Sequence, residues 1–390
     1  MRRLPRWVAY ASTQVNNYMT DTERLLILNM IEDVGSIRTR CLLEYFGSLS
    51  KVFEAGEDEL KRVKNIGSLI ALKIVQGIRE IDLNKELKLI KRHNVKVITF
   101  IDEDYPVSLK NIHDPPVVLY VKGEILPEDD IAIAIVGSRK ASFYGMQTAE
   151  RLGYELASRG VTIVSGMARG IDSSAHRGAL KANKRTIAVL GSGLANIYPE
   201  EHIILAEEIS SKGAVISEFA METIPARGNF PKRNRIISGL SKGVVVVEAA
   251  QKSGALITAD CALEQGKEVF AVPGKVDSLT SKGTNGLIKQ GAKLAETVDD
   301  VLEDLRLEDN LGSCVGYYSG SLRSYPGDNL ATALDKTESI VYNLLSSDPQ
   351  HIDEVSDVTG LGISEISKTL LNLELRKLVK QLPGKNYVKA

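Results

Sequence analysis

The apolar positions of the chain follow three successive patterns. Between residues 20 and 92 they recur at helical spacing, as in the run from Leu25 to Ile31 after a helix-start signal at Thr20. Between residues 93 and 308, short runs that are apolar on both faces alternate with helical segments, and residues 333–390 return to helical spacing. The pattern predicts an α/β domain flanked by two helical domains.

The pattern of residues 93–308 predicts an α/β domain with an extended Rossmann-like, doubly wound sheet. Runs that are apolar on both faces and separated by helices are typical of parallel strands covered on both sides. The expected strands are at residues 95–101, 117–121, 131–136, 161–164, 186–190, 214–217, 244–247 and 268–272.

The two flanking regions predict small helical modules. Glycine turns at Gly35 and Gly67 precede helices, as in helix-hairpin-helix or SAM-like domains, where a helix start can face a phosphate or only pack. Both alternatives stay open. Residues 333–390 read as three helices and a hairpin, the winged-helix pattern, with 7 Lys/Arg against 8 Asp/Glu. That balance favours a packing or protein-interaction module over a DNA-reading one.

Composition restricts the class of protein. The chain has 390 residues and a net charge of −1, so any polyanion site must rest on local charge. Its three cysteines form neither a disulfide framework nor a zinc pattern, which fits a reducing cytoplasm. We expect no metal, no cofactor and no membrane span. Residues 1–19 read as a disordered extension, with Met19 a candidate initiator, and residues 309–332 read as a linker.

Glycine and small polar residues follow nearly every expected strand. The segments are Gly137-Ser138-Arg139, Ser165-Gly166 to Gly170, Gly191-Ser192-Gly193, Ser253-Gly254 and Pro273-Gly274. In an open parallel sheet ligands bind beyond the carboxyl ends of the strands, and such turns offer backbone N–H groups to anions. The sequence predicts a phosphate-bearing ligand at this edge.

Residues 228–239 (GNFPKRNRIISG) are the most informative segment. They place Lys232, Arg233 and Arg235 beside Phe230. Cations can neutralise phosphates and an aromatic ring can stack on an unpaired base, so the segment indicates a single-stranded nucleic acid site. The alternative is a solvated basic turn before a helix.

Together these segments resemble the DNA-processing protein A (DprA/Smf) family, and the resemblance covers about 280 consecutive residues. The motifs that carry the resemblance are Gly137-Ser138-Arg139, Ser165-Gly166-x-Ala168-x-Gly170-Ile171-Asp172, Thr186 to Gly193 with Tyr198-Pro199, Ser217-Glu218, Asn229-Phe230-Pro231-x-Arg233-Asn234-Arg235, Val247-Glu248 with Ser253 to Ala259, and Pro273-Gly274.

The resemblance implies a non-enzymatic protein of natural transformation or recombination. Such a protein binds incoming single-stranded DNA, protects it, helps to load RecA recombinase and forms a homodimer through the Rossmann-like domain. It implies that Arg139 contacts a phosphate. The implied DNA-binding residues are Gly137, Ser138, Arg139, Ser165, Gly166, Gly170, Asn229, Phe230, Lys232, Arg233, Asn234 and Arg235, and the neighbouring cations Arg169 and Lys242 join them as phosphate ligands.

The alternative function is a nucleotide-processing enzyme of the lysine-decarboxylase-like Rossmann group. Candidate acid–base residues are Asp172, His176, Glu218 and Glu248, without a spacing typical of a catalytic pair or triad. The Pro-Gly-Gly-x-Gly-Thr motif of that group is missing, since Pro273-Gly274 is followed by Lys275.

Overall fold

The computed structural model describes residues 19–307, 334–346, 349–376 and 378–389. Residues 1–18 of the predicted extension and the whole predicted linker lie outside the described residues. No helix within the described part is long and apolar enough to cross a membrane.

The N-terminal region is helical, as predicted. Thr20 caps the first helix: its hydroxyl accepts from the Glu23 N–H at 3.2 Å, and the Glu23 carboxylate accepts from the Thr20 N–H at 2.8 Å. The helices are α2 (Asp21–Met30), α3 (Ser36–Phe46), α4 (Leu49–Glu54), α5 (Glu57–Leu60), α6 (Ser68–Glu80) and α7 (Leu83–Arg92).

The central sheet has nine strands in the order β1-β2-β6-β5-β4-β3-β7-β8-β9. They are β1 (Lys96–Thr99), β2 (Val118–Gly123), β3 (Ala132–Val136), β4 (Thr162–Ser165), β5 (Thr186–Val189), β6 (Ala214–Ser217), β7 (Gly243–Val246), β8 (Glu268–Ala271) and β9 (Lys293–Leu294). The doubly wound parallel sheet is confirmed for β3 to β9. The first two strands differ, because β2 runs antiparallel to both β1 and β6.

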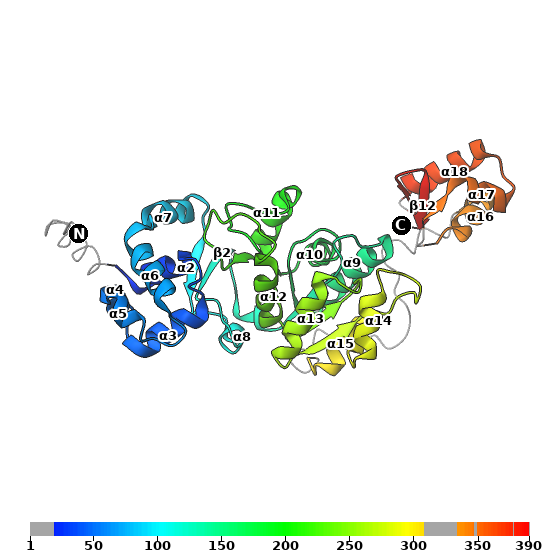
Figure 1. Cartoon of the computed structure of the whole chain (residues 1–390). Helices are drawn as coiled ribbons and strands as arrows, with labels where there is room; N and C mark the ends of the chain where they lie inside the picture. The colour runs from blue at the N-terminus through cyan, green and yellow to red at the C-terminus, as the bar shows by residue number, and fades with distance from the viewer. Residues whose placement is uncertain (1–18, 308–333, 347–348, 377, 390) are drawn as a thin grey trace. The chain divides into compact units, whose positions relative to one another are not determined.

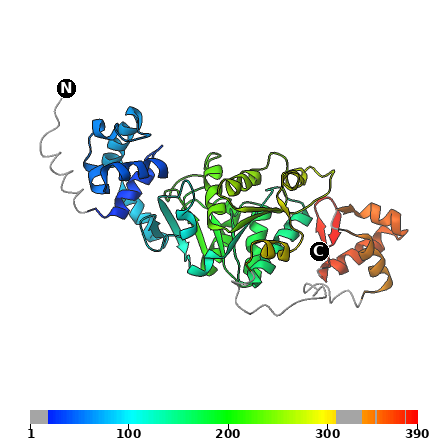
Figure 2. The same cartoon turned by 90° about the horizontal axis from the view of Figure 1, so that it is seen from below.

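Two helical layers cover the sheet (Figures 1 and 2). Alternate residues of β3 face opposite layers: Ile133 and Ile135 pack with one, Ala134 and Val136 with the other. The first layer holds α9 (Phe143–Ser158), α10 (Ile171–Lys181), α11 (Ile203–Lys212) and α15 (Val298–Asp304). The second holds α8 (Val107–Lys110), α12 (Asn229–Leu240), α13 (Gly254–Glu264) and α14 (Lys282–Lys289).

The helical N-terminal region is not detached from the sheet. Leu25 and Leu28 of α2 belong to the same buried core as Val118 and Tyr120 of β2. Helix α2 contacts β1 and β2, which are the cyan strands in Figure 1. The helical region and the Rossmann-like region therefore form one compact unit.

The C-terminal residues form a second compact unit with a winged-helix arrangement, as predicted. Its elements are α16 (Lys336–Leu344), β10 (Gln350–His351), α17 (Ile352–Thr359), α18 (Ile363–Leu375), β11 (Val379–Leu382) and β12 (Asn386–Lys389). Ile366, Leu370 and Leu373 of α18 are buried in its core. Ile340, Val358 and Leu371 follow the same apolar helical spacing but are mostly exposed.

Candidate nucleic-acid interface

The candidate site lies where the carboxyl ends of the parallel strands meet the start of α12. The chain passes from β3 to β4 on one side of β3 and returns to β7 on its other side, so the topological switch point lies between β3 and β7. Ligand crevices in open α/β sheets form at such points. The loops are joined there, since the Ser138 N–H donates to the Glu248 carbonyl at 2.6 Å.

The basic segment forms the helix α12 itself, which begins at Asn229, and not a turn that precedes a helix. Successive residues on a helix are rotated by about 100°. Adjacent cations of this segment therefore face different ways. Phe230, Arg233, Asn234 and Ile237 share one face toward the loops, whereas Lys232 and Arg235 lie elsewhere.

Two adjoining hollows lie at this edge. The first, which we call the Phe230 pocket, has a volume of about 200 Å³ and reaches the loops after β4 and β5 at Gly166, Gly191 and Tyr198. The second, which we call the switch-point groove, has a volume of about 770 Å³ and reaches the loop after β7. Both hollows are lined by Arg139, Lys140, Ala168, Phe230 and Arg233.

A cation–aromatic pair is shared by the two hollows. The guanidinium of Arg139 lies over the Phe230 ring, with Cζ 4.7 Å from the ring centroid. The Tyr198 ring centroid is 6.0 Å from that of Phe230. A planar cation on an aromatic face is favourable, and both groups can serve a nucleic acid, the guanidinium for phosphate and the rings for bases.

Glycines after β4 and β5 make room for the side chains of α12. A Cβ on Gly191 would come 2.8 Å from Cδ1 of Phe230. A Cβ on Gly166 would come 1.9 Å from Nη1 of Arg233. Glycine is therefore required at these two positions because a larger residue would displace the side chains of Phe230 and Arg233.

Arg233 is the buried cation beneath both hollows. It is 4% exposed, its Nη1 donates to the Val189 carbonyl at 2.5 Å, and its Nε has no hydrogen-bond partner among the described residues. Burial lowers the pKa of Arg233 to about 10, against the attraction of Asp172. Burial raises the pKa of Asp172, opposed by the charges of Arg233 and Arg139. Arg233 therefore stays charged at neutral pH with donor capacity to spare.

Most of the predicted DNA-binding residues converge on these hollows. The predicted residues that line one or both are Gly137, Ser138, Arg139, Gly166, Arg169, Phe230, Arg233 and Asn234. Arg169 is already engaged, because its guanidinium makes a two-point ion pair with Glu201 in which Nη2 lies 3.0 Å from Oε2.

Ser165, Gly170 and Asn229 do not line either hollow. The Ser165 hydroxyl is buried and donates to the Ile135 carbonyl at 2.6 Å, so it holds two strand ends together. Gly170 has a φ of 76°, and a Cβ there would meet the Ser138 carbonyl oxygen at 2.4 Å. Its role is the shape of the turn, since only glycine adopts this conformation freely.

Three predicted cations are placed away from the hollows. Arg235 pairs with Glu218 and donates to the Asp114 carbonyl at 2.5 Å, and Lys232 is close enough to Glu218 to act on its charge. Lys242 precedes β7 and donates its N–H to the Ala132 carbonyl at 2.7 Å, at the amino edge of the sheet. Lys232 and Arg235 lie away from the hollows because the helical rotation of α12 turns them to other faces. Lys242 does so because it precedes its strand and therefore lies at the amino edge of the sheet.

Three other exposed cations line the hollows but were missed from the sequence. Lys140 follows Arg139, whereas Arg227 and Lys252 precede α12 and α13. Each of the three cations flanks a segment that the sequence analysis had assigned to the site. Their position next to an expected strand end was the only sequence feature that could have indicated them.

The candidate acid–base residues are mainly structural. His176 is fully buried, and because the Thr186 hydroxyl donates to Ile163, Nδ1 of His176 donates to that hydroxyl at 2.7 Å. Glu218 is buried against Arg235. Asp172 lines the groove, and its carboxylate accepts from the Ala168 N–H at 3.3 Å rather than from His176. Asp172 and His176 are therefore not hydrogen-bonded to each other.

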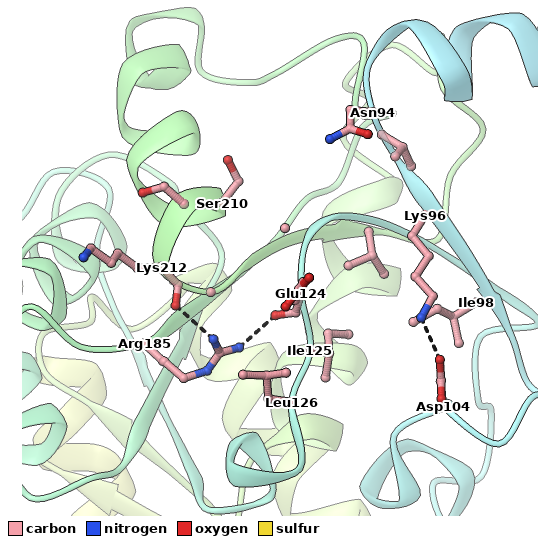
Figure 3. A pocket seen from close by; sticks show the side chains of 15 residues that line it. Asn94, Lys96, Ile98, Asp104, Glu124, Ile125, Leu126, Arg185, Ser210 and Lys212 are labelled. Atoms are coloured by element: carbon pink, nitrogen blue, oxygen red, sulfur yellow. Dashed lines mark hydrogen bonds and ion pairs between the residues drawn. The ribbon is translucent and has the colours of Figure 1, made fainter.

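A further hollow of about 670 Å³ lies at the opposite edge of the sheet (Figure 3). The Arg185 guanidinium in this hollow is hydrogen-bonded within the protein. It donates to the carbonyls of Lys212 at 3.0 Å and Glu124 at 2.8 Å, and it binds the Asp129 carboxylate. Lys96 is paired with Asp104. This hollow joins chain segments and offers few free charges to a ligand.

Comparisons with known proteins agree with this architecture. Residues 96–306 match the model of the family described as DNA recombination-mediator protein A, and residues 326–385 match the DprA winged helix domain. Protein Smf of Escherichia coli is 41% identical, covering 79% of this chain and 80% of that one. Protein Smf of Synechocystis is 34% identical and covers 93% of this chain and 97% of that one.

A solved structure supports the same conclusion. The crystal structure of DNA processing protein A from Streptococcus pneumoniae is similar with a TM-score of 0.64 and 34% identity, covering 73% of this chain and 98% of that chain. The family model spans more than half of this chain, and the relatives are covered over most of their length. The chain belongs to the DprA/Smf family of DNA recombination-mediator proteins.

Proposed function

We propose that this protein binds single-stranded DNA without reading its sequence, at the carboxyl edge of the Rossmann-like sheet. The observation that carries the proposal is the contact between Arg139 and Phe230, which is shared by two cation-lined hollows. Arg139 would hold a backbone phosphate, Phe230 would stack on a base, and Arg233 would supply charge from below.

The preference for single strands follows from the aromatic platform. Phe230 and Tyr198 offer ring faces within a pocket, which a base can reach only when it is unpaired. Phosphate contacts alone would serve single and double strands alike. Duplex DNA should therefore bind more weakly than a single strand of equal length.

The deciding experiment is a binding series by fluorescence anisotropy with oligo-dT and a duplex of the same length, at several salt concentrations. We expect tighter binding of oligo-dT and a linear fall of log affinity with log salt, since bound phosphates release counterions. Equal affinity for both forms, or affinity that does not respond to salt, would contradict the proposal.

The wider role we propose is that of the family: the protein protects incoming single strands and helps to load RecA recombinase in the cytoplasm, as a homodimer joined through the Rossmann-like domain, during natural transformation or another recombination process. Family membership supports it. Sedimentation of the full chain tests the dimer. The rate of RecA assembly on protein-covered single strands, with and without this protein, tests the loading.

We also propose that the protein is not an enzyme. Of the candidate acid–base residues, only Asp172 lines a hollow, and His176 is buried and neutral. Incubation with nucleoside monophosphates tests this: base release that disappears in Glu248→Ala would revive the enzyme alternative.

A further inference from the structure

The far wall of the switch-point groove takes no part in the contact between Arg139 and Phe230. It is formed by the start of α13 at Ser253–Gly254, together with Lys252 and Arg227. We propose that this wall is a second phosphate subsite, which holds another backbone phosphate of the strand that stacks on Phe230. This inference rests on the proposed binding of single-stranded DNA.

The start of α13 is open to an anion. The helix is 11 residues long; the Leu256 N–H donates to the Ser253 carbonyl at 3.1 Å, whereas the Gly254 N–H has no hydrogen-bond partner among the described residues. The Ser253 hydroxyl accepts from the Ala255 N–H at 3.3 Å. Space remains in front of Gly254, because a Cβ built there would meet nothing within 4 Å. A phosphate can therefore approach the backbone.

A buried cation provides a second, independent indication of an anion. Arg233, 4% exposed, lines the same groove with an Nε that has no hydrogen-bond partner in the described residues. Its neighbour Asn234 donates to the Gly254 carbonyl at 3.3 Å and so ties the start of α13 to α12. The two phosphate-facing helices are thereby held in register.

The charges of the groove point the same way. Five cationic side chains line it, against one carboxylate, that of the buried Asp172. Lys140, Arg227 and Lys252 are exposed and take part in no ion pair within the described ranges, unlike Arg169 and Arg235. Free cations around an open helix start suit an extended polyanion better than one small anion.

Because the two hollows share lining residues, we expect one continuous strand of DNA to occupy both. Arg139, Phe230 and Arg233 line both hollows, so a nucleotide on Phe230 directs its neighbouring phosphate toward either side. The strand therefore runs from the loop after β5, over Phe230, to the start of α13.

The test uses Gly254→Asp and Gly254→Asn in the full-length protein, with oligo-dT and fluorescence anisotropy. Both side chains fit the open space, and an acidic residue at a helix start is favourable for the fold. Only Gly254→Asp puts a negative charge where the phosphate would lie. We expect its affinity to fall about tenfold or more, as for loss of a charge-assisted hydrogen bond, and that of Gly254→Asn to change much less.

A second pair of variants measures the phosphate count. The double variant Arg227→Ala/Lys252→Ala should reduce the magnitude of the salt slope by about 0.7, since the one phosphate that the subsite neutralises on a single strand contributes about that much. The matched control is Lys184→Ala/Lys242→Ala, which removes the same charge from exposed positions at the amino edge of the sheet. The control should keep the wild-type slope.

The outcomes separate the two proposals. If the wild type does not bind oligo-dT, the proposed function fails. If the wild type binds and Arg139→Ala weakens it, but Gly254→Asp and the double variant behave like the wild type, only the second subsite is wrong. Equal effects of both double variants would also overturn it, because they would reflect net charge alone.

Discussion

The guanidinium of Arg233 lies directly against the Cα of Gly166, where a Cβ would come 1.9 Å from Nη1. This contact joins α12 to the end of β4 and fixes the depth at which the helix sits over the sheet. The buried cation, the Phe230 ring and the two hollows all depend on that depth. The glycine serves the site through packing, by leaving room for a cation.

Gly166→Ala should displace Arg233. Because the cation is buried and tightly packed, we expect a loss of about 1–3 kcal/mol in the free energy of unfolding and weaker binding of oligo-dT. Urea unfolding and anisotropy measure the two effects. Gly254→Ala is the matched control, since its added methyl group meets open space; equal stability of the two variants would contradict the packing role of Gly166.

Arg139→Ala should weaken the binding of single-stranded DNA by about 1–3 kcal/mol, because it removes a charge-assisted phosphate contact. Arg139→Lys should restore only part of the loss, since an ammonium group cannot stack flat on Phe230 or bind a phosphate at two points. Anisotropy on oligo-dT decides between these outcomes. Wild-type affinity in Arg139→Ala would remove this residue from the site.

Glu201→Gln should tighten the binding of single-stranded DNA. The hydrogen bond and charge of Arg169 lower the pKa of Glu201, so the carboxylate stays ionised at neutral pH and competes with phosphate for Arg169. Removing its charge frees the guanidinium. The gain should disappear in the double variant Arg169→Ala/Glu201→Gln; a gain that persists there would show that Arg169 is not the group released.

Arg235→Ala should affect stability more than DNA binding. Arg235 pairs with buried Glu218, and burial raises the pKa of that carboxyl, so loss of the cation leaves an unpaired acid. We expect a loss of about 3 kcal/mol in the free energy of unfolding. The second change in Arg235→Ala/Glu218→Gln should recover part of it. A variant of normal stability that no longer binds DNA would instead place Arg235 in the interface.

The contribution of His176 to the stability of the protein should fall in mild acid. Burial lowers the pKa of His176 from 6.5 to about 3, so the unfolded chain takes up a proton that the folded protein refuses. The contribution is fully present above pH 6.5 and is lost as the pH falls toward 3, at about 1.4 kcal/mol per pH unit. Urea unfolding at pH 7, 6 and 5 measures this slope. His176→Asn should flatten it, whatever its effect on absolute stability.

Much of the architecture could be predicted from the sequence. Strand 214–217 was placed to the residue, and the other expected strands within a few residues, because a run apolar on both faces has few alternatives to a buried parallel strand; the short β9 was not expected. The antiparallel entry of β2 was not predicted, since apolar periodicity does not encode strand direction. The exposed Val358 and Leu371 show the same limit, because spacing alone does not define which helical face finds a partner.

The candidate site was predicted in its chemistry but not in its membership. By itself the sequence predicted that Arg139, Phe230 and Arg233 lie together at one edge of the sheet, as they do, because small residues at strand ends and local cations are properties of the chain. Only the tertiary structure decided that Arg235 stabilises the fold, that Lys242 lies at the opposite edge, and that Lys252 lines the groove. The reason is geometric: the helical rotation of α12 and the direction of β7 place neighbouring cations on different faces, and only the packing of distant segments settles which face meets the ligand.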